Sequence, residues 1–176
     1  MKNDSEEYIK SRNFFDKNAE GKKEKMHPIV VCWKLKTPNN IGNILRLADN
    51  MACEKVLFVH DNPSFRDRRI KKTAQTSFDA VKWSFCSSKN WEEQIPKDYK
   101  IIAIETTNKA KNLFKTTLDE KTALILGNEK VGIDELVLEK CNSSIFIPMK
   151  GHNRSMNVSH ALTIVIGEWM RQNYYL

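Results

Sequence analysis

Three segments of the sequence combine small residues with side chains that donate or accept hydrogen bonds. They are residues 37–42 (TPNNIG), 127–132 (GNEKVG) and 149–157 (MKGHNRSMN), and Arg46 follows the first segment closely. Amides, hydroxyls and a guanidinium can align a polar reactant and stabilise a negative charge that develops on it. If the fold brings these segments together, they predict a site that holds and orients such a reactant.

Several common kinds of site are excluded by the same residues. No Gly-x-Gly-x-x-Gly pattern is present, which argues against a Rossmann dinucleotide site. Gly127 and Gly132 have the spacing of a P-loop, but Ile133 and Asp134 stand where a phosphate-binding Lys and a Ser or Thr are needed. Ser155 lacks the Gly-x-Ser-x-Gly context of a hydrolase nucleophile. The sequence therefore argues against a kinase, an ATPase and a serine hydrolase.

Neither the histidines nor the cysteines have the spacing of a metal site. The cysteines form no Cys-x-x-Cys pair, and we expect all four to be reduced. Residues 1–10 lack the apolar stretch of a signal peptide, and no apolar run is long enough to span a membrane. We therefore expect a cytoplasmic protein with no metal and no membrane partner. The residues concerned are His27, His60, His152, His160, Cys32, Cys53, Cys86 and Cys141.

The composition is that of a soluble globular domain with a basic surface. The chain has 176 residues, of which 40% are hydrophobic and 29% are charged, and its formal net charge is +7. This length is sufficient for one domain with a sizeable core. The positive charge favours a polyanionic partner such as a nucleic acid, although surplus lysine also serves solubility.

Apolar patterning predicts alternating strands and helices. Residues 1–26 form a charged N-terminal arm, either a short helix with a basic linker or an arm that orders on contact, and residues 27–176 form the main domain. The alternation predicts an α/β fold with a mainly parallel sheet and helices on both faces. Such sheets bind ligands beyond the carboxyl ends of their strands. The predicted strands are residues 28–35, 55–60, 80–86, 100–105, 122–126 and 144–148, and the predicted helices are residues 40–52, 66–75, 91–95, 134–140 and 158–172.

Two polar residues of the helix predicted at 40–52 each have two interpretations. The apolar residues of this helix form one face and Arg46 lies off it, so Arg46 is either a solvated surface charge or a functional group. Asn40 is either the N-cap of the helix, a position that Asn fills well, or part of a site. The pattern alone favours the surface charge for Arg46.

Taken in order, the three segments resemble the sequence motifs of the SpoU (TrmH-like) branch of the SPOUT methyltransferases. The first motif, Asn-x-Gly-x-x-x-Arg, matches residues 40–46, the second matches residues 124–132, and the third matches residues 147–149 with 155–159. The resemblance implies an α/β domain with a C-terminal trefoil knot, a feature that simple topology rules treat as rare. It also implies a homodimer whose active site is completed across the interface.

The resemblance further implies that S-adenosylmethionine is the cofactor and that a ribose 2′-hydroxyl of RNA accepts the methyl group. Arg46 would act as a base or stabilise the developing oxyanion, and Asn40 would orient it. Because arginine is almost never deprotonated, we favour electrostatic stabilisation. The residues that would support the site are Glu129, Ser155 and Asn157, and the implied cofactor-binding residues are Glu105, Thr106, Gly127, Ile147, Ser155 and Met156.

We expect RNA binding from clustered Lys and Arg side chains, which neutralise phosphates. Residues 38–47 and 154–157 resemble the compact tRNA wobble-position enzymes of the family, whereas residues 127–129 and Gly151 resemble tRNA-guanosine and rRNA members, so tRNA is favoured over rRNA. Two other functions stay open: a non-catalytic RNA-binding module with the same fold, and a methyltransferase for a small molecule or a protein. The RNA-binding candidates are Arg66, Arg68, Arg69, Lys71, Lys72 and Arg154, with Lys22, Lys23, Lys25 and Lys150 as further candidates.

Overall fold

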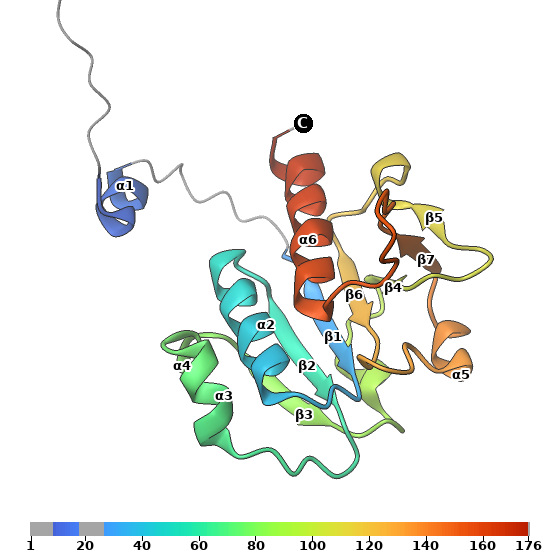
Figure 1. Ribbon diagram of the computed structural model, residues 1–176, viewed down its shortest axis with the longest axis horizontal. Helices are drawn as coiled ribbons and strands as arrows, with labels where there is room; N and C mark the ends of the chain where they lie inside the picture. Colours follow the sequence, from blue (N-terminus) through green and yellow to red (C-terminus); the bar gives the residue numbers. More distant parts are fainter. Residues whose placement is uncertain (1–8, 18–26, 176) are drawn as a thin grey trace, which may run out of the picture.

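A seven-stranded parallel sheet forms the centre of the computed structural model, which describes residues 9–17 and 27–175 (Figure 1). The strands are β1 (Ile29–Trp33), β2 (Lys55–Val59), β3 (Trp83–Cys86), β4 (Lys100–Ile104), β5 (Lys111–Asn112), β6 (Thr122–Leu126) and β7 (Ser143–Phe146). Their order in the sheet is β3-β2-β1-β6-β4-β7-β5, and every neighbouring pair is parallel. The prediction of a mainly parallel sheet is confirmed.

Helices cover both faces of this sheet. The helices of the described residues are α1 (Ser11–Lys17), α2 (Pro38–Asn50), α3 (Asp67–Ala74), α4 (Ser77–Ala80), α5 (Glu135–Leu138) and α6 (Val158–Tyr174), with the 3-10 helices η1 (Trp91–Gln94) and η2 (Leu113–Lys115). One face is covered by α2 and α6, which lie side by side in Figure 1, and α3 packs against α2. The other face is covered by α5 and η1.

The two strands at the centre of the sheet show why the sequence folds in this way. β1 (IVVCW) and β6 (TALIL) are buried along their whole length. Their side chains alternate between the faces. Val30 and Cys32 therefore join the core under α2 and α6, whereas Ile29 and Val31 join the core under α5 and η1. A continuous apolar run is what a strand covered on both faces needs.

The start of α2 differs from the sequence prediction. The helix begins at Pro38, and its N-cap is Thr37, so the interpretation of Asn40 as the N-cap is wrong. Proline suits the first helical position because its fixed φ is already helical and its missing N–H has no intrahelical acceptor there. Asn40 therefore lies in the first turn, where its side chain is 6% exposed.

Two further differences concern short elements. Residues 77–80 form α4, so the strand predicted at 80–86 begins later, at Trp83. The Ser77 hydroxyl donates a hydrogen bond to Asp49 of α2 (2.7 Å), which holds this extra helical turn in place. β5 was not predicted, because a strand of two residues is too short to show an alternating pattern.

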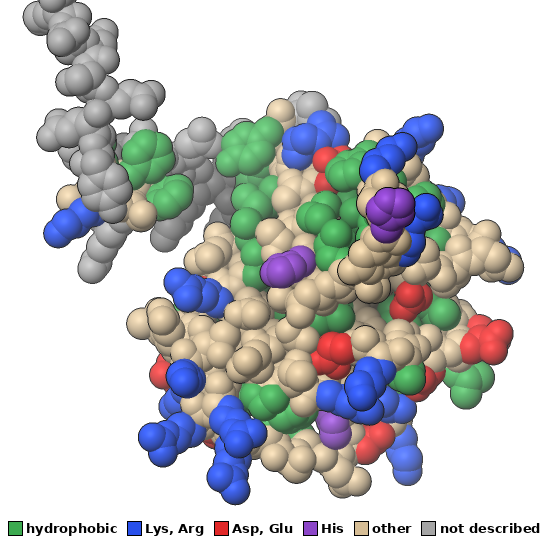
Figure 2. Space-filling view, in the orientation of Figure 1, with side chains coloured by type: hydrophobic (Ala, Val, Ile, Leu, Met, Phe, Trp, Pro, Cys, Tyr) green, Lys and Arg blue, Asp and Glu red, His purple; other side chains and the backbone are tan. Residues whose placement is uncertain are grey.

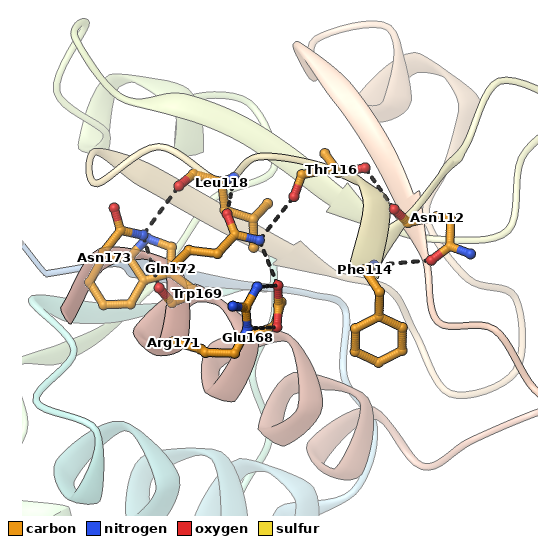
Figure 3. Close-up of polar contacts among 9 residues, drawn as sticks. All are labelled: Asn112, Phe114, Thr116, Leu118, Glu168, Trp169, Arg171, Gln172 and Asn173. Carbon is orange, nitrogen blue, oxygen red and sulfur yellow. Dashed lines mark hydrogen bonds and ion pairs between the residues drawn. The ribbon is translucent and has the colours of Figure 1, made fainter. Parts of the chain in front are cut away.

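The C-terminal half of α6 binds the main chain of the segment that connects β5 to β6 (Figure 3). The Gln172 amide donates to the carbonyl oxygen of Thr116 (3.0 Å) and accepts the N–H of Leu118 (2.8 Å). Asn173 donates to the carbonyl oxygen of Leu118 (3.2 Å). The segment is therefore fixed to the helix by its backbone, whatever its side chains are.

Two further side chains of α6, Trp169 and Glu168, complete these contacts. The Trp169 indole N–H donates to the carbonyl oxygen of Asp119 (2.9 Å). Glu168 is only 8% exposed and accepts two hydrogen bonds from Arg171 and one from Gln172 (Figure 3). We call this set the C-terminal latch, which consists of Glu168, Trp169, Arg171, Gln172, Asn173 and the main chain of residues 116–119.

The N-terminal arm is described only at residues 9–17, which contain α1. The candidates Lys22, Lys23 and Lys25 lie outside the described residues. In the part of the chain that the structure describes, no helix has the length and apolar character needed to cross a membrane. The same residues contain no group of three or more His, Cys, Asp or Glu side chains that could hold a metal ion.

Candidate active site

A cavity of about 240 Å³ lies where β4, β6 and β7 end and α6 begins. This is the carboxyl edge of the parallel sheet, where ligands bind in open α/β folds. The structure brings together here all the residues that the sequence associates with a cofactor. These lining residues are Glu105, Thr106, Gly127, Ile147, Ser155 and Met156. The RNA-binding candidate Arg154 also lines the cavity.

The loop formed by residues 127–132 requires glycine at both ends. The main chains of Asn128 and Gly132 exchange two hydrogen bonds of 2.9 Å, so the loop closes on itself. A Cβ atom at Gly127 would lie 2.4 Å from the carbonyl carbon of Gly132, closer than any side chain allows. Gly132 has a φ of +71°, which other residues rarely adopt. The two glycines therefore shape the wall of the cavity.

The Glu105 carboxylate holds two loops of the cavity together. One oxygen accepts the N–H of Thr106 (2.8 Å), and the other accepts the N–H of Ile133 (3.1 Å). A Cβ atom at Gly132 would lie 2.5 Å from this carboxylate, so the fit is tight. Glu105 thus lines the cavity and also fastens the end of β4 to the 127–132 loop.

Three polar side chains from the three sequence motifs form a continuous chain of hydrogen bonds. The Asn157 amide N–H donates to the side-chain oxygen of Asn40 (3.0 Å), and the Asn40 amide N–H donates to Glu129 (2.9 Å). Asn157 is also the N-cap of α6, because its side-chain oxygen accepts the N–H of Ser159 (2.9 Å). We call Glu129, Asn40 and Asn157 the amide relay. It joins the start of α6 to the start of α2 and to the cavity wall.

The Glu129 carboxylate also accepts three hydrogen bonds from the turn before α2. The donors are the N–H of Lys36 (3.0 Å), the N–H of Thr37 (3.1 Å) and the hydroxyl of Thr37 (2.6 Å). Partial burial raises the pKa of Glu129, but these hydrogen bonds and that from Asn40 lower it, and the net pKa lies below its ordinary value. At neutral pH the carboxylate is therefore ionised and occupied by donors, which suits a holding group and not a general base.

Arg46 does not join this cluster. It is exposed on α2, it is not among the residues that line the cavity, and it has no hydrogen bond or ion pair within the described parts of the chain. The Asn40 side chain, which the sequence associates with orienting Arg46, bonds Glu129 and Asn157 instead. The structure thus joins Asn40, Glu129 and Asn157 by hydrogen bonds, places Ser155 with Glu129 in the cavity lining, and leaves Arg46 outside that lining.

Five further RNA-binding candidates lie at α3 and its N-cap, and Lys150 is exposed in the segment after β7. Ile70 and Ala74 are the buried residues of this helix, and all five basic candidates are exposed. Figure 2 shows Lys and Arg side chains gathered over α3. Lys71 forms an exposed ion pair with Asp79 (3.8 Å). The other basic side chains still give this helix a positive charge. The exposed candidates are Arg66, Arg68, Arg69, Lys71 and Lys72.

Sequence reasoning missed two residues that shape the site. Asn128 is 5% exposed, and its amide donates to the carbonyl oxygen of Lys34 (2.5 Å) while its side-chain oxygen accepts the N–H of Lys130 (2.9 Å). Thr37 holds Glu129 as described above. Two features of the sequence could have indicated these residues. Asn128 follows a loop glycine, and Thr37 precedes a proline at the start of a helix.

Relatives of known name match most of the chain. The model of the SpoU rRNA Methylase family matches residues 27–167. The 23S rRNA (guanosine-2'-O-)-methyltransferase RlmB of Blochmanniella floridana is 29% identical over 148 residues, which are 84% of this chain and 58% of that protein. A putative TrmH family tRNA/rRNA methyltransferase of Staphylococcus epidermidis is 27% identical over 172 residues, which are 97% of this chain and 68% of that protein. The chain therefore spans little more than half the length of the RlmB relative.

Solved structures share the fold at lower identity. The AdoMet-bound rRNA methyltransferase from Sinorhizobium meliloti has a TM-score of 0.77 and 18% identity, with 85% of this chain and 58% of that chain covered. A structure described as "Structural insights into the 2-OH methylation of C/U34 on tRNA" has a TM-score of 0.74 and 23% identity, with 83% and 96% covered. These likenesses establish the fold alone, but the family match covers most of the sequence. The chain belongs to the SpoU rRNA methylase family.

Proposed function

We propose that this chain is an S-adenosylmethionine-dependent methyltransferase that modifies a ribose 2′-hydroxyl in RNA, with tRNA as the favoured substrate. One observation carries the proposal. The amide relay joins the start of α2 and the start of α6 to Glu129, which lies in the wall of the cavity. A reaction between two bound molecules needs polar groups fixed in this way, because alignment lowers the barrier to transfer.

The lining of the cavity suits a donor with an adenosine and an aliphatic part. The 127–132 loop, in which the main chains of Gly127 and Gly132 pack tightly together, forms one wall. Ile147 and Met156 add apolar surface, and Thr106 and Ser155 add hydroxyls. With Glu105, these residues would hold S-adenosylmethionine. When bound, this donor supplies a methyl group already activated by the positive charge on its sulfur.

We further propose a homodimer in which each cavity is completed by Arg46 of the partner subunit. Within one chain Arg46 is exposed and outside the cavity lining, so it is free to serve another copy. Figure 2 shows hydrophobic side chains over α6. Ile164 and Met170 of this helix are half-buried, which suits packing against a second copy. The guanidinium would then stabilise the negative charge on the ribose oxygen as that oxygen bonds the methyl carbon of the donor and its proton passes to water.

The trefoil knot is also part of this proposal. The C-terminal latch supports it, because residues 116–119, which come before β6, lie against the helix that follows β7. In a knotted chain, an earlier segment lies across a later one, as residues 116–119 lie against α6. The knot would keep the loops that line the cavity in place without a larger core.

RNA would bind through α3 and through Arg154 at the cavity, since both present exposed positive charge. The resemblance of residues 38–47 to tRNA-modifying members supports tRNA. The name of the RlmB relative supports rRNA as the alternative. An RNA-modifying role also supports a cytoplasmic location, where the four free cysteines stay reduced.

Methyl transfer to separate RNA pools tests the function. The purified protein is incubated with methyl-labelled S-adenosylmethionine and with tRNA or rRNA, and the nucleosides are then separated. We expect the label in the ribose of a tRNA nucleoside. Ribose label in rRNA alone would move the assignment to rRNA. Donor binding without transfer would instead identify a non-catalytic RNA-binding module, and label only in protein or a small molecule would contradict the proposal.

Subunit mixing tests the shared site. Arg46→Ala removes the guanidinium, and Ser155→Trp fills the cavity at an exposed position that tolerates a larger side chain. Each variant alone should be inactive. A mixed dimer made by co-expression should recover activity, because one cavity is open and receives Arg46 of the partner subunit. If mixed dimers stay inactive while both variants fold, Arg46 acts within its own chain.

A further inference from the structure

The Thr37 hydroxyl has an unusual partner for its position. Thr37 is the N-cap of α2, where a threonine hydroxyl ordinarily accepts a backbone N–H of the first helical turn. Here the side chain makes no capping hydrogen bond. It donates instead to the Glu129 carboxylate at 2.6 Å, across 92 residues of sequence. The hydroxyl is thus directed to the site and not to the helix.

This contact is one of four that hold the Glu129 carboxylate, together with the N–H groups of Lys36 and Thr37 and the Asn40 amide. One carboxylate oxygen of Glu129 accepts the Thr37 hydroxyl, the Thr37 N–H and the Asn40 amide N–H. Because Asn40 donates to Glu129, its side-chain oxygen faces Asn157 and accepts that residue's amide. A rotation of the Glu129 carboxylate would therefore disturb Asn40 and then Asn157.

The 127–132 loop also fixes the turn that precedes α2. Asn128 and Glu129 are adjacent, and together they bind the main chain of Lys34, Lys36 and Thr37. Lys34 has a φ of +49°, a conformation that is uncommon for a residue with a long side chain. The turn between β1 and α2 is therefore held in one shape by the cavity loop.

We propose that Thr37 is a positioning residue for methyl transfer, whose hydroxyl holds the Glu129 carboxylate in the orientation that the amide relay needs. The assignment rests on the proposed function. Thr37 is exposed, so its hydroxyl contributes little to the core. The helix keeps its own start without the side chain, because Pro38 begins it and the Thr37 carbonyl oxygen accepts the N–H of Asn40 (3.0 Å).

Three variants separate this role from a structural one. Thr37→Val removes the hydroxyl at nearly constant shape, and Thr37→Ser keeps the hydroxyl. Thr116→Val is the matched control, because the Thr116 hydroxyl also donates one hydrogen bond, to the carbonyl oxygen of Asn112 (2.8 Å), at a position outside the cavity lining. We expect kcat to fall about tenfold in Thr37→Val, with KM for donor and RNA nearly unchanged, and to be restored in Thr37→Ser. Thr116→Val should keep the kcat of the wild type.

A titration of Glu129 by NMR gives a readout that does not depend on activity. The hydrogen bond from Thr37 is one of the contacts that lower the pKa of Glu129, so Thr37→Val should raise this pKa, whereas Thr37→Ser and Thr116→Val should not. A double-mutant comparison completes the test. If Thr37 acts through Glu129, adding Thr37→Val to Glu129→Gln should cause no further loss of kcat.

The outcomes distinguish this assignment from the proposed function. An active wild type with an unchanged Glu129 titration, or with unchanged kcat, in Thr37→Val would overturn the positioning role alone. Independent, multiplicative losses in the double mutant would do the same. A wild type that transfers no methyl group to RNA would overturn both the proposed function and the role of Thr37 in it.

Discussion

The two ends of α6 use polar side chains in different ways. At the N-terminal end, Asn157 bonds the side chain of Asn40, which bonds the side chain of Glu129, and the chain of contacts ends at the cavity. At the C-terminal end, Gln172 and Trp169 bond main-chain atoms of the connection between β5 and β6. One end connects the three sequence motifs, and the other fixes a loop by its backbone.

Burial follows the same division. Trp169 is fully buried and Glu168 is 8% exposed, whereas Asn157 and Thr37 are exposed. A hydrogen bond lost in the buried latch leaves polar groups unpaired, which costs stability. At the N-terminal end, a hydrogen bond lost by the exposed Asn157 side chain can be replaced by water, so the cost falls mainly on alignment. The same helix thus contributes to stability at one end and to the geometry of the candidate site at the other.

Arg46→Ala should separate activity from stability most strongly. Removing one group that stabilises an oxyanion costs roughly 10²–10³ in rate. The free energy of unfolding should not change, because the side chain is exposed and has no bonded partner within the described residues. Methyl-transfer kinetics and urea unfolding measure the two effects. Asn43→Ala, at an exposed position of the same helix, is the control and should keep full activity.

Gln172→Leu should have the opposite profile. It removes three hydrogen bonds and leaves the main-chain groups of Thr116 and Leu118 without a partner, so we expect a loss of about 2 kcal/mol in the free energy of unfolding, or roughly a thirtyfold change in the folding equilibrium. The kcat of the folded variant should stay close to that of the wild type. A large loss of kcat without a loss of stability would contradict the division between the two ends of α6.

Asn157→Ala should show an intermediate result. The variant loses the N-cap of α6, worth about 1 kcal/mol, and also the amide that holds Asn40. We expect a small loss of stability and a fall in kcat of about tenfold. Asn157→Asp keeps the cap but not the donor to Asn40. It should restore the stability while kcat stays low.

The pH dependence of the latch gives the smallest effect. The hydrogen bond and charge of Arg171 lower the pKa of Glu168 from its ordinary value of 4.5 to about 2. A pKa lowered on folding means that the ionised group adds stability above 4.5, and that this contribution is lost as the pH falls from 4.5 towards 2. The difference in Tm between wild type and Glu168→Gln should be present at neutral pH and should shrink in that window. A difference that is constant with pH would exclude this charge as its source.

Much of the fold follows from patterns that the sequence displays openly. Long buried strands such as β1 and β6 appear in the sequence as apolar runs. The rule that ligands bind beyond strand ends predicts that the three polar segments lie near a ligand site, and the cavity lies at that edge of the sheet. The shorter elements could not be predicted. β5 has two residues, and α4 depends on a hydrogen bond between Ser77 and Asp49 that only the tertiary structure supplies.

The candidate site also has features that the sequence could predict and features that it could not. The motif residues could be selected because their order and spacing are linear features of the sequence. The contacts of Glu129 with Thr37 and Asn40 span 92 and 89 positions and depend on side-chain direction, which spacing does not encode. The helical pattern places Arg46 off the apolar face, and the structure finds its side chain exposed there, but such a pattern does not say what an exposed residue contacts.

The position of the transferred methyl group tests the central claim most directly. A methyl group on a ribose 2′-oxygen removes the nucleophile that alkali needs to cleave the next phosphodiester bond. After reaction with labelled donor and alkaline hydrolysis of the RNA, we predict that the label will be recovered in alkali-resistant dinucleotides, and that Arg46→Ala will abolish it. Label recovered in mononucleotides would show methylation of a base, and would contradict the account.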